Sequence, residues 1–427
     1  MQLCVFLLIF SEKYGTINEI AWIERIEKMT KIAILGFGVV GSGVAKLLSD
    51  NAREVYSQGG DEVYVKYILD LRDFPDSPFG DRVVHDFDII ANDSEIDCVL
   101  EVMGGSHPAY EYTCRALKAG KSVISSNKEV VANFGDEFLK LAEENGVVYR
   151  FEAAVGGGIP VISPMISCVG HNKIREVRGI LNGTTNYILT KMFSFGESFD
   201  SALKDAQERG YAERNPDADV LGTDAARKIT ILAALATGKL VDVNEIHTEG
   251  ITRIRAEDVQ DAEKLGMKIK LVGRCVVSGN GAFILVAPFM IKDGEPLAGV
   301  SGVYNAVELY AEPLGNVMFY GQGAGAGATA SAVVSDLMQI MRSGRSCRCA
   351  EMIKDDSARL PFSDFVSKSY FAFSDATRES VMEAFGEVEF VESEGECAFV
   401  CAPMSEAEAI ERISSFDGEL LSRIRLL

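Results

Sequence analysis

Short apolar runs alternate with amphipathic stretches over the first third of the chain. The apolar runs are rich in Val, Ile and Tyr, which is typical of strands, and they include KIAIL (31–35), CVLEVMG (98–104), SVISSN (122–127) and VVYRFEAAV (147–155). Between them, stretches such as FGDEFLKLAEENG (134–146) carry apolar residues at helical spacing. Strands that alternate with helices in this way predict βαβ units and a parallel sheet.

A different pattern follows Pro160. The stretch IREVRGILNGTTNYIL (174–189) predicts a strand, a polar turn and the start of a helix, and FILVAPFMI (283–291) predicts a further strand. Residues 324–342 are rich in Gly and Ala and then strongly helical, and the polar stretch after them is typical of a linker. The middle of the chain is therefore predicted to form a second domain of the α+β class.

The C-terminal tail alternates once more between strand and helix patterns. From residue 369 onward the predicted order is strand, helix, strand, strand, helix, strand, which is the order of a split βαβ module. In this order and in length the tail resembles an ACT domain, the amino-acid-sensing unit attached to many biosynthetic enzymes. The Arg-Pro-Gly stretch that follows the first strand of that domain is absent, and the residues in its place, SDATRES (374–380), are better suited to capping a helix.

Three glycines, Gly36, Gly38 and Gly41, stand between the first predicted strand and the helix after it, in the pattern GFGVVG. In a dinucleotide-binding turn the first glycine permits a tight bend, the second lets the backbone approach a pyrophosphate, and the third lets helix and strand pack closely. The start of the helix then offers free N–H groups to the phosphates. This context favours an NAD or NADP site, although the same glycines also suit a βα turn without a ligand.

Two charged residues near the end of the second predicted strand bear on the choice of coenzyme. Asp70 stands where an acidic residue can bind the ribose 2′-hydroxyl of NAD. Arg72 can instead pair with the 2′-phosphate of NADP. The sequence supports both interpretations and leaves the preference open.

These patterns divide the chain into six parts. Residues 1–28 are interpreted as an N-terminal extension, with Met29 as an alternative native start, because their apolar run has no positive residue ahead of it and no cleavage site after it. The predicted fold class is α/β: a Rossmann-type doubly wound parallel sheet, an α+β catalytic and oligomerisation domain, and a small ACT-like α+β module. The predicted ranges are 29–155 for the nucleotide-binding domain, 156–323 for the catalytic domain, 324–342 for a helix that returns to the first domain, 343–367 for a linker and 368–427 for the module.

Asp224 and Lys228 stand on the apolar face of a helix that is predicted to begin at Pro216. With a step of roughly 100° per residue they fall close to Leu221 and Ile231. Charges on the buried side of a helix are costly unless they are paired or used. They therefore form either a structural ion pair one turn apart or part of a catalytic site.

Composition narrows the range of partners and compartments. The chain has 42 Lys and Arg against 63 Asp and Glu, and this net charge of -21 repels phosphate backbones and anionic lipid, so nucleic acid and membrane are excluded as partners. The nine cysteines are scattered, without the second pair or histidine that would complete a metal site beside Cys347 and Cys349. They are interpreted as thiols of a reducing cytoplasm. With four histidines, acid and base chemistry falls mostly to Lys, Asp and Glu.

Seven motifs, taken together and in order, resemble the homoserine dehydrogenase family: GFGVVGSGV, EVMGG, SSNKEVVA, FEAAVGGGIPVI, GILNGTTNYIL, GYAE…DADVLGTDAARK and GQGAGAGATASAVVSD. The resemblance runs from about Thr30 to Arg342. It implies the reversible NAD(P)-dependent reduction of aspartate 4-semialdehyde to homoserine, on the route to threonine, methionine and isoleucine. We also expect a homodimer or homotetramer, because an ACT-like sheet leaves edges that need cover.

The resemblance also assigns roles to particular residues. It places the family's two functional lysines on Lys128 and Lys228, with Lys228 as the proton donor and Lys128 in contact with nicotinamide and substrate. A lysine ammonium can stabilise and protonate the alkoxide that forms when hydride reaches an aldehyde. Asp224 is expected to orient Lys228, Glu213 to bind the substrate's ammonium group, and Asp219 to hold further polar groups.

The remaining implied sites concern the carboxylate, the coenzyme and a metal. Gly183 and Thr184 are expected either to cradle the substrate's carboxylate or only to cap a helix. A structural sodium ion is implied at the Glu152 side chain and the backbone carbonyls of Val155, Gly157 and Ile159, where the glycines can equally form only a hinge. The expected residues of the NADP or NAD site are Phe37, Gly38, Val39, Val40, Gly41, Asp70, Arg72, Met103, Gly104, Ser125, Lys128 and Gly323.

Two other interpretations stay open at this point. One is another Rossmann oxidoreductase of the glucose-fructose oxidoreductase type, whose usual Glu-Lys-Pro is replaced here by Asn127, Lys128 and Glu129. The other is a catalytically silent amino-acid-sensing relative, which would be expected to lose Lys228 or Glu213. The sequence leaves the coenzyme preference, the size of the oligomer and the effector open.

Overall fold

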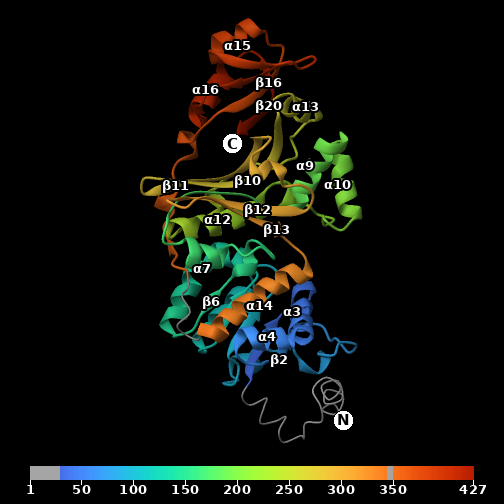
Figure 1. Ribbon diagram of the computed structural model, residues 1–427, viewed down its shortest axis with the longest axis vertical. Coiled ribbons are helices and arrows are strands. Elements are labelled where there is room, and N and C mark those ends of the chain that lie inside the picture. The colour runs from blue at the N-terminus through green and yellow to red at the C-terminus, as the bar shows by residue number, and fades with distance from the viewer. Residues whose placement is uncertain (1–28, 344–349) are drawn as a thin grey trace, which may run out of the picture.

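The computed structural model describes residues 29–343 and 350–427. The interpretation of residues 1–28 and the start of the predicted linker lie outside the described residues. Along the long axis of the molecule, an N-terminal parallel sheet, a large mixed sheet and a C-terminal module follow one another (Figure 1).

Six parallel strands form the N-terminal sheet, in the order β3-β2-β1-β4-β5-β6. This is the strand order of the Rossmann fold, in which ligands bind at the carboxyl ends of the strands where the order reverses. The strands are β1 (Thr30–Leu35), β2 (Val63–Leu69), β3 (Val83–Val84), β4 (Cys98–Glu101), β5 (Ser122–Ser125) and β6 (Tyr149–Arg150).

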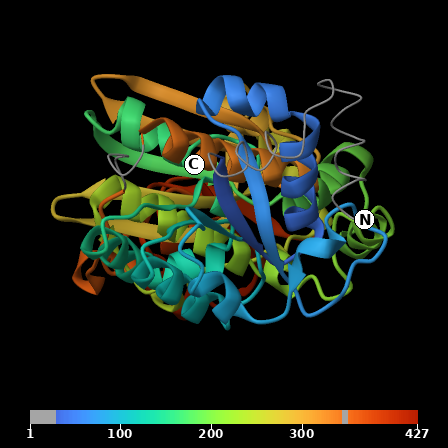
Figure 2. The same ribbon diagram turned by 90° about the horizontal axis from the view of Figure 1, so that it is seen from below.

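Helices cover both faces of this sheet, because successive strand residues point to opposite sides. Ile32 and Ile34 of β1 pack into one buried cluster with α3 (Val39–Asp50), α4 (Ala52–Gly59) and α14 (Ala326–Ser343). Ala33 and Leu35 face the other cluster, whose helices are α5 (Phe87–Ala91), α6 (Ala109–Lys118) and α7 (Lys128–Glu144). Figure 2 shows the orange α14 beside the blue helices of the first βα unit. A helix far along the sequence from α3 and α4 therefore packs with them on the same face of the first domain's sheet.

A large mixed sheet forms the middle of the molecule. Five strands follow one another in the order β13-β12-β7-β10-β11, with antiparallel pairing throughout. Helix α12 (Thr223–Thr237) packs against β7, β10 and β11 and lies between the sheet and α7 (Figure 1). The strands are β7 (Lys173–Ile180), β10 (Met267–Ser278), β11 (Gly281–Lys292), β12 (Tyr304–Glu312) and β13 (Gly315–Gln322).

The helix predicted to begin at Pro216 is two helices, so that prediction was wrong. Helix α11 (Asp217–Val220) ends before Gly222, which adopts a left-handed conformation with φ +86° and precedes α12. A side chain at this backbone conformation is strained, and glycine is the residue that avoids the strain. Leu221 therefore lies outside α12 and is largely exposed, whereas Asp224, Lys228 and Ile231 are buried on it.

The remaining elements of the middle part surround the large sheet. The helices are α8 (Ile162–Pro164), α9 (Gly183–Phe195), α10 (Phe199–Glu208) and α13 (Ala256–Lys264), and the short strands are β8 (Lys239–Leu240), β9 (His247–Thr248), β14 (Ile353–Lys354) and β15 (Val366–Ser367). A further short strand, β19 (Met404–Ser405), belongs to the C-terminal module. The segment predicted as a linker pairs β14 with β8 and β15 with β19. From Ala350 onward it is therefore held against its neighbours by strand pairing.

The C-terminal module continues the large sheet. Its strands lie in the order β20-β16-β18-β17, and β20 pairs in parallel with β11 through Phe289 and Arg425. Thr377 caps the first helix through the backbone N–H of Ser380, so the prediction of a helix cap in SDATRES is confirmed. The elements are β16 (Ser369–Ser374), α15 (Arg378–Phe385), β17 (Val388–Val391), β18 (Cys397–Cys401), α16 (Glu406–Ser415) and β20 (Glu419–Leu426).

The predicted fold class is confirmed by the parallel six-stranded sheet and the mixed sheet beside it. Within residues 29–343 and 350–427, we find no helix with the length and apolar character needed to cross a membrane.

Candidate active site

Two lysines and an aspartate meet at the contact between α7 and α12. Lys228 Nζ lies 2.8 Å from Asp224 Oδ2 and donates to the backbone carbonyl of Leu181 at 2.7 Å. Lys128, the first residue of α7, forms an ion pair with the other oxygen of Asp224. The predicted catalytic residues are thus brought together from two domains.

Burial sets the charge properties of this cluster. Asp224 is 4% exposed and Lys228 is 8% exposed, whereas 40% of the Lys128 side chain is accessible. Burial alone would raise the pKa of Asp224, but the charges of Lys228 and Lys128 hold it well below its usual range. Burial lowers the pKa of Lys228, and Asp224 opposes this effect only in part. Lys228 is therefore an ammonium that gives up a proton more readily than a lysine in water.

Asn182 is a residue of the site that the sequence analysis missed. Its side-chain Nδ2 donates to Asp219 Oδ1 at 2.7 Å and to Asp224 Oδ2 at 3.0 Å. Its Oδ1 accepts from the backbone N–H of Thr185 at 2.9 Å and so caps α9. Burial and the nearby charge of Asp224 raise the pKa of Asp219. One amide thus fixes two carboxylates at the start of a helix, and its position directly before GTT in a strand-to-helix turn was the available signal.

The expected substrate-binding residues lie around the start of α9. Gly183 and Thr184 belong to its first turn, so the cap is Asn182, the residue before them. Thr184 Oγ1 donates to the backbone carbonyl of Tyr211 at 2.6 Å, which ties the loop after α10 to this helix. Glu213 lies in that loop with an exposed side chain, and among the described residues we find no hydrogen bond or ion pair between it and the lysine cluster.

The glycine turn after β1 has the geometry of a dinucleotide site. Gly36 has φ +94°, and a Cβ on Gly41 would lie 2.0 Å from the Gly36 carbonyl oxygen. A Cβ on Gly38 would meet no atom within 4 Å, so the backbone there borders open space. Helix α3 begins at Val39 without a side-chain cap, which leaves N–H groups of its first turn for an anion such as a pyrophosphate.

Asp70 fastens the glycine turn to the end of β2. Its carboxylate accepts four hydrogen bonds, from the backbone N–H groups of Phe37 and Arg72 and from two nitrogens of the Arg72 guanidinium, at 2.8 to 3.2 Å. Burial opposes ionisation, but the Arg72 side chain and the two N–H groups lower the pKa of Asp70 to about 2. These bonds fill the lone pairs of the carboxylate. Arg72 is 65% exposed at its side chain and is the group that faces solvent.

The other expected coenzyme residues lie along the same edge of the sheet. Met103 packs against Gly36, where a Cβ would come within 3.1 Å of the Met103 side chain, and Gly104 follows it in the β4–α6 loop. Ser125 ends β5 and is buried. Gly323 lies against Gly157 and Asn305 at the junction of the middle part with α14, whose first residue, Ala326, lies against Gly43 of α3.

The implied metal site has oxygen donors in a buried loop. The Glu152 carboxylate accepts the backbone N–H groups of Val161, Ile162 and Ser163 at 2.7 to 2.8 Å, and it is 2% exposed. A carboxylate has about four acceptor positions, so one stays available. Among the described residues, we find no hydrogen bond to the carbonyl oxygens of Val155, Gly157 or Ile159. This donor set fits a small hard cation.

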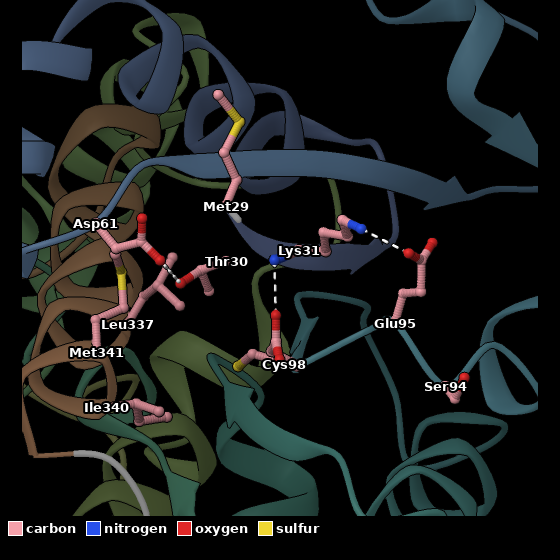
Figure 3. A pocket seen from close by; sticks show the side chains of 11 residues that line it. Met29, Thr30, Lys31, Asp61, Ser94, Glu95, Cys98, Leu337, Ile340 and Met341 are labelled. Carbon is pink, nitrogen blue, oxygen red and sulfur yellow. Dashed lines mark hydrogen bonds and ion pairs between the residues drawn. The ribbon is translucent and has the colours of Figure 1, made fainter. Parts of the chain in front are cut away.

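A cavity of about 470 Å³ lies at the opposite end of the N-terminal sheet (Figure 3). It is lined by Met29, Thr30 and Lys31 at the start of β1 and by α14. Four of its polar side chains are already paired, since Lys31 Nζ contacts Glu95 at 2.7 Å and Thr30 Oγ1 donates to Asp61 at 3.2 Å. Ligands of such sheets bind at the carboxyl ends of the strands, so this cavity is separate from the candidate site.

The fold and the site together define a class of protein. A Rossmann sheet with a glycine turn at its carboxyl edge, and a lysine–aspartate cluster that starts at the same edge, belongs to an NAD(P)-dependent oxidoreductase. Comparison with known proteins makes the class more specific. Residues 36–152 match the family model of the homoserine dehydrogenase NAD-binding domain, and residues 160–338 match that of homoserine dehydrogenase.

Individual relatives agree with these matches. The homoserine dehydrogenase of Neisseria gonorrhoeae is 40% identical over 321 residues, which is 74% of this chain and 73% of the relative. A crystal structure of the enzyme from Thiobacillus denitrificans has a TM-score of 0.86 at 32% identity and covers 94% of this chain and 98% of its own. A mutant of a hyperthermophilic archaeal homoserine dehydrogenase, solved with NADPH, has a TM-score of 0.64 at 29% identity over 75% of this chain and all of its own.

The chain belongs to the homoserine dehydrogenase family, whose members are NAD(P)-dependent oxidoreductases that act on a CH–OH group. The predicted family and enzyme class are confirmed. The glucose-fructose oxidoreductase type and a silent sensing relative are not favoured.

Proposed function

We propose that the contact between α7 and α12 is the place where homoserine and aspartate 4-semialdehyde are interconverted. The observation that carries this proposal is the convergence of Lys128 and Lys228 on one buried carboxylate, that of Asp224. NADPH or NADH, when bound, supplies the hydride for reduction of the aldehyde. The residues of the chain then have to orient the carbonyl and manage the proton.

Lys228 is the proton donor in this proposal. As hydride reaches the aldehyde carbon, negative charge develops on the oxygen, and a nearby ammonium stabilises that charge and protonates it. Burial lowers the pKa of Lys228, which favours proton release, and the Leu181 carbonyl and Asp224 hold its Nζ in place. In homoserine oxidation the neutral amine accepts the proton of the hydroxyl group.

Asp224 and Lys128 prepare Lys228 for this role. Asp224 keeps its charge because two ammonium groups face it, and it thereby limits how far the pKa of Lys228 falls. Lys128 is partly accessible at the carboxyl edge of the Rossmann sheet, so it can contact both the nicotinamide and the substrate. Its charge adds to the stabilisation of a developing alkoxide.

The two ends of the amino-acid substrate require opposite charges. Glu213 and Asp219 are the acidic residues we assign to the ammonium end, with Asp219 fixed by Asn182 and Glu213 in the exposed loop nearby. The first turn of α9, at Gly183 and Thr184, is assigned to the carboxylate end, because a helix start favours anions.

The coenzyme is assigned to the edge that runs from the glycine turn to Ser125. Gly38, Val39, Val40 and Gly41 surround the uncapped start of α3, which suits the pyrophosphate. Because the oxygens of Asp70 are engaged and the Arg72 guanidinium is exposed, we propose that Arg72 reads a 2′-phosphate and that NADP is the preferred coenzyme. The structure with NADPH is that of the archaeal relative.

We also propose a structural sodium ion at Glu152, Val155, Gly157 and Ile159. The support is the free acceptor position of a buried carboxylate beside three carbonyl oxygens without hydrogen-bond donors among the described residues. Oxygen ligands suit such a cation. It would stabilise the loop between the two domains, and the reaction itself uses no part of it.

Assembly into a homodimer or homotetramer is a further part of the proposal. Strand β13 ends the large sheet, and Tyr304, Tyr310, Met318 and Tyr320 are exposed on β12 and β13. An open strand edge with exposed aromatic residues needs cover. We place the protein in the cytoplasm, which agrees with free cysteines in the described part of the chain, such as Cys98 and Cys275.

Initial rates test this function directly. We expect the purified chain to oxidise L-homoserine with NADP or NAD and to leave L-serine, which is one carbon shorter, unreacted. The same assay on Lys228→Ala and Lys128→Ala should show loss of turnover. A chain that binds the coenzyme but oxidises no homoserine would contradict the assignment.

A further inference from the structure

A buried carboxylate, Glu101, stands at the centre of the coenzyme edge without touching the proposed reacting groups. It is the last residue of β4 and is completely buried. Its Oε2 accepts from Ser125 Oγ at 2.6 Å, and its Oε1 accepts from the backbone N–H of Met103 at 2.9 Å. Glu101 and Ser125 are paired neighbours on adjacent strands. An isolated buried carboxylate is costly, so these bonds compensate for its burial.

The bond to Ser125 leads to Lys128. Ser125 Oγ accepts from the backbone N–H of Asn127 at 3.0 Å. Asn127 caps α7, since its Oδ1 accepts from the N–H groups of Glu129 and Val130, and its Nδ2 donates to the Gly105 carbonyl at 2.7 Å. Lys128 is the first residue of this helix. The position of its backbone therefore depends on the Glu101–Ser125–Asn127 chain of hydrogen bonds.

The bond to Met103 leads to the glycine turn. Met103 and Val102 pack against Gly36, where a Cβ would lie 3.1 Å from Met103 Cγ and 3.2 Å from the Val102 carbonyl oxygen. Asn127 also reaches the same loop through Gly105. One carboxylate is thus connected to the turn after β1, the loop after β4 and the turn after β5.

The charge of Glu101 matters for these connections. An ionised carboxylate only accepts hydrogen bonds, whereas a protonated one also carries a donor and holds the Ser125 hydroxyl less firmly. Burial raises the pKa of Glu101 to about 7, although Ser125, Met103 and Asn127 oppose this. Tyr149 of β6 is the titratable group beside it, with Cys114 of α6 beyond Tyr149, and burial keeps both neutral by raising the pKa of the phenol and of the thiol.

We propose that Glu101, acting through Ser125 and Asn127, is the positioning residue that holds Lys128 and the coenzyme-facing loops in the geometry required for hydride transfer. The proposal rests on the role of Lys128 given above. Since Lys128 contacts Asp224, a shift at the start of α7 also disturbs the proton-donating pair. The ionised form of Glu101 is the active form, so turnover rises as pH increases through about 7.

The test compares two variants that cut the same connection at different points. In Glu101→Gln the amide N–H faces Ser125 Oγ, while the amide oxygen can still accept from Met103. Ser125→Ala removes the bond to Asn127 and leaves Glu101 charged. Both should lower kcat by about 10- to 100-fold, the cost of a small misplacement of a catalytic group. The coenzyme KM should stay within about twofold in Glu101→Gln, whereas Ser125 is itself assigned to the coenzyme edge, so Ser125→Ala is compared by kcat alone. Glu137→Gln on α7, the helix that begins with Lys128, is the matched control, since the exposed Glu137 carboxylate accepts a hydrogen bond from half-buried Tyr110 at 2.8 Å.

The pH profile separates positioning from general stability. We expect the kcat of the wild type to fall as the pH decreases below 7. Glu101→Asp should show the same pH step at a lower kcat, and in Glu101→Gln kcat should no longer change in this pH range. Melting temperatures are measured in parallel, because an effect on folding alone changes the active fraction and leaves the pH step in place. Wild-type kcat in Glu101→Gln with an unchanged pH step would overturn the proposal. If Glu101→Gln does not fold, wild-type kcat in Ser125→Ala overturns it by itself.

Lys128→Ala distinguishes the proposed role of Lys128 in the reaction from the positioning role of Glu101. Loss of turnover in Lys128→Ala, with wild-type kcat in Glu101→Gln and Ser125→Ala, would overturn the positioning role alone. Full turnover in Lys128→Ala would overturn the proposed role of Lys128 and the positioning role with it. Loss of turnover in all three variants, with the control unchanged, supports both.

Discussion

Lys128 and Lys228 bind opposite oxygens of one carboxylate, although they come from different domains. Lys128 starts α7 of the Rossmann part, and Lys228 lies on α12 beneath the large sheet. A second ion pair, between Arg227 and Glu129 at 3.1 Å, joins the same two helices. The lysine–aspartate cluster therefore exists only while the two domains are in contact, and the proposed function places coenzyme and substrate on either side of this contact.

Replacement of Lys228 by alanine should lower kcat by about 10³-fold or more, because the developing alkoxide loses its proton donor. Coenzyme binding, measured by fluorescence titration, should stay within about twofold, since the Nζ of Lys228 contacts Asp224 and the Leu181 carbonyl and forms no hydrogen bond with the described glycine turn. Lys191→Met is a suitable control, because Lys191 pairs with Glu197 at the far end of α9. Turnover within tenfold of the wild type would exclude Lys228 as the donor.

Asn182→Ala should lower kcat/KM for homoserine by about 10- to 100-fold. Loss of a hydrogen bond by a buried charged group costs about 1 to 3 kcal/mol, which corresponds to a change of this size. Asp219 and Asp224 then lose the donor that they share. The helix cap is lost as well, so Ser198→Ala, which removes the cap of α10, serves as the control for capping alone. Equal effects of both variants on kcat/KM would show that Asn182 acts only as a cap.

The contrast between Asn182 and the two lysines shows what the sequence can and cannot predict. The glycine turn, Lys128 and Lys228 belong to local patterns, in which strand, turn and helix follow each other in the chain. Asn182 escaped notice because its partners lie 37 and 42 residues away. The break at Gly222 was missed because a single glycine is tolerated inside a helical pattern. The pairing of β20 with β11 joins Arg425 to Phe289, and no local signal predicts such a contact.

Arg72→Ala should weaken NADPH selectively, raising its KM by about tenfold or more, because the exposed guanidinium is the group assigned to the 2′-phosphate. The KM for NADH should change by less than about threefold. Asp70→Ala should weaken both coenzymes, since it frees the Phe37 N–H and loosens the glycine turn. An unchanged ratio of the two KM values in Arg72→Ala would place the coenzyme selectivity elsewhere.

Arg425→Met should lower the free energy of unfolding by about 3 to 5 kcal/mol, the usual cost of breaking a buried ion pair. Arg425 is buried and contacts both Glu406 and Glu249, so it joins the module to the middle of the chain. The exposed pair of Arg378 and Glu392 provides the control, because Arg378→Met should cost less than about 1 kcal/mol. Urea unfolding of the two variants measures the difference, and similar losses would show that the module is only loosely attached.

Lys270→Met tests a buried cation outside the active site. Lys270 donates to Asn186 and to the Val300 carbonyl, and burial together with Lys268 lowers its pKa to about 8 from 10.5. Between these values the unfolded chain binds more protons than the folded one, so the wild type gains stability relative to the variant as pH rises, by at most about 1.4 kcal/mol per pH unit. Urea unfolding at pH 7.5 and 9.5 measures this gain. Lys268→Met, at a half-buried lysine, is the control. The prediction is contradicted if the difference in unfolding free energy between wild type and Lys270→Met is the same at both pH values, or if the difference for Lys268→Met rises equally.

The return of α14 to the first domain affects how the protein folds during synthesis. Val333, Val334 and Leu337 of this helix fill the same buried cluster as Ile32 and Ile34. The ribosome releases them only after the middle part of the chain has been made. Until then, the face of the Rossmann sheet that α14 shares with α3 and α4 lacks one of its three helices. Domains otherwise tend to fold in the order in which they emerge. Here the first domain to be synthesised cannot be completed until the middle of the chain has been translated.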